Sequence, residues 1–152
     1  MIHVKTGTGL PKRIPAKLLK NAARQALDHQ GFPTPHTMTI LLADDSRLQS
    51  LNREYLGVDA PTDVLSFPSD EIEPETGEKY LGDVVISVPR AEQQAKAAGH
   101  SLDAEAQLLV VHGTLHLLGH DHANAEDKAC MWKAQGEVLE RLGLGQIRIR
   151  ED

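Results

Sequence analysis

Four of the eight histidines lie in one segment, HGTLHLLGHDH, which runs from His112 to His122. His112 and His116 are four residues apart, and in a helix this spacing puts both imidazoles on one face, about 6 Å apart along the axis. Gly119 follows, and glycine readily adopts the left-handed conformation that ends a helix and reverses the chain. Such a reversal would bring His122 back to the first two. The segment therefore predicts three neutral nitrogen ligands and an open position, as in catalytic zinc sites.

The residue types at this predicted centre also indicate its chemistry. Tetrahedral nitrogen sites favour zinc, while nickel, copper and manganese are compatible with the same ligands. A metal ion held in this way lowers the pKa of a bound water to about 7 and polarises a phosphoryl oxygen. The chain lacks the clustered carboxylates of a two-metal nuclease. We therefore expect one zinc ion per chain and a metal-dependent hydrolase.

The histidine spacing also matches the metal-binding pattern of the metzincin proteases, H-E-x-x-H-x-x-G-x-x-H. In those enzymes the glutamate after the first histidine is the general base, and here that position is Gly113. Met131, the candidate for a Met-turn, falls in an apolar helical stripe and is expected in the core. A metallopeptidase is therefore an alternative that keeps the metal ligands and lacks the base.

Helices are expected at both ends of the chain, with strands between them. Apolar residues at helical spacing predict a core-facing helix over 15–29, with its stripe at Leu19, Ala22, Ala23, Ala26 and Leu27. A second helix is expected after the Asp44-Asp45 cap, where Leu48, Leu51 and Tyr55 align. Further helices are expected over 89–99, from Ser101 or Asp103 to 118, and over 125–142. Strands are expected at 37–43, 62–67 and 80–88, with an edge strand at 2–5.

These elements predict the fold class. The run Val84-Val85-Ile86 lacks polar alternation, which indicates a strand covered on both faces. The acidic stretch 69–79 has the composition of an exposed loop. We therefore predict an α+β fold, with a three- to four-stranded mixed sheet packed against about five helices. At 152 residues, with 40% apolar and 25% charged residues, the whole chain 1–152 is expected to form one hydrolase domain.

Composition excludes several function classes. No apolar run is long enough to span a membrane or to act as a signal peptide. Cys130 is the single cysteine, so no intrachain disulfide forms, and we expect a cytoplasmic location. The net charge of −6 argues against indiscriminate nucleic-acid binding but not against a local basic site. The best clustered cations are Lys17, Lys20 and Arg24, which share a helix face and are either an RNA contact or an ordinary solvated surface.

Three segments together resemble the YbeY family of bacterial endoribonucleases that mature ribosomal RNA. The family segments H-G-x-L-H-L-x-G-Y-D-H, P-T-[DN]-V-L-S-F-P and L-G-D-[IVL]-x-I match residues 112–122, 61–68 and 81–86 in order and spacing. His120 departs from the pattern, because the family usually has tyrosine there. Many members also carry an arginine after the tyrosine that matches Tyr55, and this chain has Leu56. Arg53, one helical turn earlier, is the candidate replacement.

The resemblance implies a function as well as a fold. It implies a single-strand-acting, metal-dependent endoribonuclease in 3′-end maturation of small-subunit (16S-type) ribosomal RNA and in ribosome quality control. It also implies ribosomal RNA and components of the small ribosomal subunit as partners. A metal-stabilised ribosome assembly factor is a further alternative.

Three further residues are candidates for catalysis: Ser66, Asp121 and Arg53. Ser66 is favoured by the resemblance. Asp121 can accept an N–H from a ligand imidazole or simply form the turn after the helix. Asp63 and Ser66 are an odd number of strand positions apart, so at most one of them is expected to line the cleft.

Overall fold

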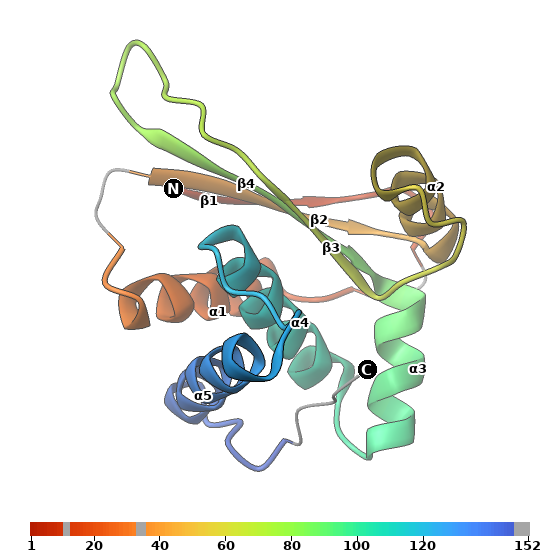
Figure 1. Ribbon diagram of the computed structural model, residues 1–152. Coiled ribbons are helices and arrows are strands. Elements are labelled where there is room, and N and C mark those ends of the chain that lie inside the picture. The colour runs from red at the N-terminus through yellow and green to blue at the C-terminus, as the bar shows by residue number, and fades with distance from the viewer. Residues whose placement is uncertain (11–12, 33–35, 148–152) are drawn as a thin grey trace.

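The computed structural model describes residues 1–10, 13–32 and 36–147, and in this part of the chain four strands form one sheet with five helices around it (Figure 1). The strands are β1 (Ile2–Thr6), β2 (His36–Ala43), β3 (Val64–Pro68) and β4 (Lys79–Ser87). The helices are α1 (Ala16–His29), α2 (Asp45–Leu56), α3 (Val88–Ala98), α4 (Leu102–Leu117) and α5 (Ala125–Arg141). The predicted α+β class is confirmed.

The sheet is mixed and has the strand order β1-β2-β4-β3. Strands β1, β2 and β4 run parallel, and β3 pairs antiparallel with β4 at one edge. The predicted edge strand near the N-terminus is therefore confirmed as β1. The third predicted strand is the interior strand β4, where Val84, Val85 and Ile86 are at most 3% exposed, which confirms burial on both faces.

Two apolar clusters lie on opposite faces of this sheet. Val84 and Ile86 belong to the larger one, which is built with residues of α1, α4 and α5. Val85 belongs to a smaller one together with Ala43, Leu48 and Leu65. Figure 1 shows the corresponding layers, with α1, α4 and α5 on one side of the sheet and α2 on the other.

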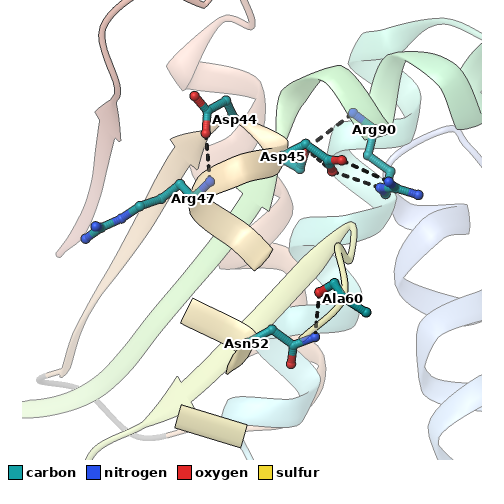
Figure 2. A network of polar contacts seen from close by, with 7 residues as sticks. Asp44, Asp45, Arg47, Asn52, Ala60 and Arg90 are labelled. Atoms are coloured by element: carbon teal, nitrogen blue, oxygen red, sulfur yellow. Dashed lines mark hydrogen bonds and ion pairs between the residues drawn. The ribbon is translucent and has the colours of Figure 1, made fainter. Parts of the chain in front are cut away.

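The predicted helices occur with small changes at their ends. The apolar stripe of α1 is buried as expected, and the helix begins one residue after Pro15, which is the N-cap rather than the first helical residue. Asp44 caps α2 by accepting a hydrogen bond from the backbone N–H of Arg47 at 2.8 Å (Figure 2). Along α2, Leu48 is buried, while Tyr55 is 63% exposed and lies edge-on to Phe67 of β3. The stripe of α2 therefore leaves the core before the helix ends.

Helix α4 is the central helix of the larger layer. Ser101 caps it by accepting from the backbone N–H of Ala104, and twelve of its sixteen residues are buried. A helix that is apolar on nearly all sides is held by neighbours on all sides. The two histidines that α4 carries are therefore attached to one of the most constrained elements of the fold.

The expected loop and surface features are also present. Residues 69–78 form a largely exposed connection that projects beyond the sheet between β3 and β4 (Figure 1). Cys130 is a free, exposed thiol on α5. Among the described residues, no helix is long and apolar enough to cross a membrane.

Candidate metal centre

Three histidine side chains converge beside α4. His112, His116 and His122 each offer one ring nitrogen, and these nitrogens all lie within 4.8 Å of one another. The ring centroids are 4.7 Å apart for His112 and His116, and 5.3 Å apart for His116 and His122. Such a group of three neutral nitrogen donors can hold a metal ion.

Local backbone geometry brings the third histidine to the other two. His112 and His116 are half-buried on α4, whereas His122 is exposed in the turn after the helix. Gly119 has φ +100°, a conformation that side-chain-bearing residues rarely adopt, and the chain reverses there as predicted. The carboxylate of Asp121 accepts a hydrogen bond from the backbone N–H of His122 at 2.7 Å. Asp121 is therefore placed as a turn residue that fixes the backbone of His122.

A buried glutamine determines the tautomer of His112. The Oε1 atom of Gln135 lies 2.9 Å from Nδ1 of His112, and Gln135 is only 1% exposed. Because an amide oxygen can only accept, Nδ1 carries the proton and donates it. The lone pair of the ring is then on Nε2. This is the usual arrangement of a metal-binding histidine whose second nitrogen is held by a neighbouring acceptor.

His116 is kept neutral by its surroundings. Burial, followed by the proximity of His112 and His122, lowers the pKa of His116 to about 4, while Asp121 acts weakly in the opposite direction. Metal binding requires the neutral imidazole, because a proton and a metal ion compete for the same lone pair. The site thus presents His116 in its ligand form at neutral pH.

The indole of Trp132 on α5 closes one side of the cluster. Its ring centroid lies 6.0 Å from that of His112 and 5.7 Å from that of His122, edge-on in both cases. The Nζ atom of Lys128 lies 5.7 Å from the centroid of the same indole. Trp132 is half-buried against the larger core, so it forms an apolar wall that limits how far the two imidazoles can turn.

The three histidines open into a cavity of about 390 Å³ between α4 and the β3 edge of the sheet. The other lining residues are Thr62, Asp63, Val64, Leu65, Ser66 and Pro68. The Ser66 hydroxyl donates to the backbone carbonyl of Gly113 at 3.0 Å and so joins β3 to α4. The expectation that at most one of Asp63 and Ser66 lines the cleft is wrong. Asp63 precedes β3, which begins at Val64, so strand alternation does not govern its direction.

The remaining candidate residues lie outside this lining. Arg53 is exposed on α2 and its Nη1 atom is 3.8 Å from a carboxylate oxygen of Asp59. Leu56, at the position of the family arginine, is 60% exposed. His120 is turned away from the three-histidine group, since its Nε2 donates to the Oε1 of Gln30 at 2.7 Å.

The predicted basic stripe lies on α1, where Lys17 and Arg24 are exposed and Lys20 is half-buried. None of these three residues lines the cavity of the three histidines. Their contact with RNA therefore remains a prediction.

Comparison with known proteins places the chain in a family. The sequence model of a family described as endoribonuclease YbeY matches residues 3–143. The chain belongs to the YbeY family. A protein named endoribonuclease YbeY from Pelotomaculum thermopropionicum is 49% identical over 130 residues, which cover 84% of this chain and 86% of the relative. A protein of the same name from Halalkalibacterium halodurans is 38% identical over 150 residues, which cover 93% of this chain and 92% of the relative.

A solved structure shows the same fold. The solution structure of TM1509 from Thermotoga maritima covers 100% of this chain and 99% of its own, with a TM-score of 0.56 and 24% sequence identity. At that identity the likeness concerns the fold alone.

Two residues around the centre of this YbeY-family chain were missed in the sequence. Gln135 occupies a core position of α5, four residues after Met131, and a glutamine in an apolar stripe is a signal for a buried polar partner. Trp132 had no such signal, because its neighbours are residues remote in sequence. Both residues come from α5, which only tertiary packing brings against α4.

Proposed function

We propose that the chain is a metal-dependent endoribonuclease acting on single-stranded parts of small-subunit ribosomal RNA, in 3′-end maturation and ribosome quality control. The observation that carries the proposal is the cluster of three imidazoles opening into a cavity at the sheet edge. The name shared by the relatives, endoribonuclease YbeY, supplies the substrate class. The proposed partners are ribosomal RNA and small-subunit components in the cytoplasm.

One zinc ion per chain is the proposed cofactor, with His112, His116 and His122 as ligands. The donor set fits, because three ring nitrogens lie within 4.8 Å of one another and the pKa of His116 keeps that imidazole neutral. When bound, such an ion supplies Lewis acidity toward water and a phosphoryl oxygen. Gln135 holds the tautomer of His112, and Asp121 holds the backbone of His122.

Other residues are assigned by their place in the cavity. Asp63 is the carboxylate in the lining and can accept a proton from the attacking water. Ser66 keeps the β3 edge at a constant distance from α4 through its bond to Gly113. Arg53, Lys17, Lys20 and Arg24 are proposed to contact RNA phosphates outside the cavity.

Space at Gly113 argues against the metallopeptidase alternative. A Cβ atom at this position would lie 2.6 Å from Cγ1 of the buried Val84. The helix therefore has no room for the glutamate that serves as general base in the metzincins. Restoring that residue would require α4 to move away from the sheet.

The proposal is tested by pairing metal content with RNA cleavage. We expect wild-type protein to carry about one metal ion per chain, and His112→Ala, His116→Ala or His122→Ala to lose most of it. His120→Ala is the matched control, because it removes a nearby imidazole that bonds to Gln30 instead. Elemental analysis gives the occupancy, and a single-stranded RNA containing the 3′ end of small-subunit ribosomal RNA gives the cleavage rate.

Controls separate the three function classes. Zinc should support RNA cleavage, a chelator should abolish it, and casein should remain intact. Wild-type protein that carries metal but leaves the RNA uncut would contradict the proposal. Cleavage that persists in the triple histidine variant would indicate a contaminant and favour an assembly factor.

A further inference from the structure

A second cavity, of about 270 Å³, adjoins the one that contains the three histidines. The two share the lining residues Thr62, Asp63, Val64 and His112. The rest of the second lining comes from α3, α4 and α5 and from the loop before β3: Pro61, Arg90, Gln94, Leu108, Leu109 and Gln135. The size is near the lower end for ligand pockets, ~300–1,000 Å³, so it suits one small group.

Arg90 presents a positioned cation to this second cavity. Its Nε and Nη2 atoms each lie 2.9 Å from a carboxylate oxygen of Asp45 on α2, as a two-pronged pair (Figure 2). A guanidinium has five N–H groups, and this pair uses two of them. Within the described part of the chain the other three make no hydrogen bond. Asp45 therefore fixes the orientation of Arg90 and leaves N–H donors for a ligand.

Gln135 supplies a second donor. Its Oε1 accepts from His112, and among the described residues its Nε2 has no hydrogen-bond partner. The side chain is 99% buried, and it lines the second cavity. This Nε2 is not sealed from solvent, so it is open to a ligand in the cavity. The geometry therefore favours a ligand that offers acceptor oxygens to Arg90 and Gln135 together.

We propose that the second cavity binds the phosphodiester group of the nucleotide next to the one held at the three histidines. Guanidinium groups match phosphate oxygens in a two-pronged geometry, and an amide N–H adds a third bond. Two carboxylates act on Arg90, Asp45 in contact and Asp63 through its charge. The three side chains together carry a formal charge of −1, so a phosphodiester with its single charge is repelled less than a doubly charged phosphate and is held by directed N–H bonds. The inference rests on the proposed function, because it names a part of that substrate.

The test is the salt dependence of RNA binding. A labelled single-stranded RNA is titrated with zinc-loaded protein between about 50 and 200 mM salt, and gels confirm that it is intact. We expect Arg90→Gln to weaken binding about tenfold and to reduce the slope of log affinity against log salt by about 0.7, the value for one phosphate contact on a single strand. Asp45→Asn is the matched control, because it breaks the same ion pair and keeps the cation, so its slope should equal that of wild type.

Three outcomes overturn the subsite: an unchanged slope in Arg90→Gln, an equal loss of slope in Asp45→Asn, or no binding by wild type. If wild type cleaves RNA and Arg90→Gln keeps the wild-type slope of log affinity against log salt, the subsite is refuted and the proposed function is not. An Arg90-dependent slope without cleavage refutes the proposed function and supports the subsite. If Arg90→Gln fails to fold, dimethyl phosphate is added to zinc-loaded wild type, and the side-chain amide signals of Gln135 are followed by NMR. Shifts support the subsite and unmoved signals overturn it.

Discussion

At Gly113 helix α4 packs closely against the sheet, and replacing this residue with alanine is a direct test of the packing that positions the histidines. A Cβ atom there would lie 2.6 Å from Cγ1 and 3.1 Å from Cγ2 of Val84, and 3.2 Å from Oγ of Ser66. Val84 is fully buried in the interior strand β4, so it has little freedom to move. We expect Gly113→Ala to force α4 away from β3 and β4.

The expected magnitude follows from two opposing effects. Alanine is favoured over glycine inside a helix by roughly 0.5–1 kcal/mol, because glycine loses more backbone freedom on folding. Inserting a methyl group into a tightly packed core costs about 1–3 kcal/mol. At a separation of 2.6 Å the packing cost is the larger effect, so the free energy of unfolding should fall by about 0.5–2 kcal/mol. Metal affinity should fall as well, since α4 carries two of the three histidines.

Urea unfolding followed by circular dichroism measures the stability of each variant, and elemental analysis measures its metal content. Gly136→Ala on α5 is the matched control, because a Cβ atom there meets nothing within 4 Å. That variant should gain up to about 1 kcal/mol. Adding Val84→Ala removes both contacted methyl groups, so the double variant should be more stable than the sum of the single changes predicts, by about 1–2 kcal/mol. Stabilisation of Gly113→Ala equal to that of Gly136→Ala, or strict additivity with Val84→Ala, would refute the reasoning.

Three further predictions concern pH, fluorescence and RNA contact. Because the pKa of His116 is lowered from 6.5 to about 4, the unfolded chain takes up a proton in this window that the folded chain does not. The free energy of unfolding of chelator-treated protein should thus fall as the pH drops from 6.5 to about 4, by about 1–2 kcal/mol after allowance for partial exposure. Urea unfolding that shows the same loss of stability in wild type and in His116→Gln would contradict this. Trp132 is the sole tryptophan and lies against two imidazoles, so its fluorescence emission should change as zinc binds. An emission spectrum that stays constant while zinc uptake is measured would count against the position of Trp132 beside the histidines. Reversing the charges of Lys17, Lys20 and Arg24 should lower the salt slope of RNA binding by up to about 2, whereas an unchanged slope would assign them to a solvated face.

Much of the fold was predictable because the relevant signals are local. The stripe of α1, the apolar run of β4 and the reversal at Gly119 each depend on residues a few positions apart. Their geometry follows from helix and strand periodicity and from the conformational range of glycine. The convergence of the three histidines was predictable in the same way, since one helix and one turn bring them together.

The surroundings of the histidines depend on contacts between residues far apart in the chain. Gln135 is 23 residues from His112, and Arg90 is 45 residues from Asp45. No local pattern encodes such pairs, because they arise only when α5 packs on α4 and when α2 and α3 meet beside the sheet. Strand alternation failed at Asp63 because this residue lies just outside β3, which begins at Val64, although its carbonyl already accepts a hydrogen bond from the N–H of Ser87 in β4. Local signals, namely helix periodicity and the turn at Gly119, thus account for the three histidines, whereas tertiary packing supplies their hydrogen-bond partner, their apolar wall and the cation in the adjoining cavity.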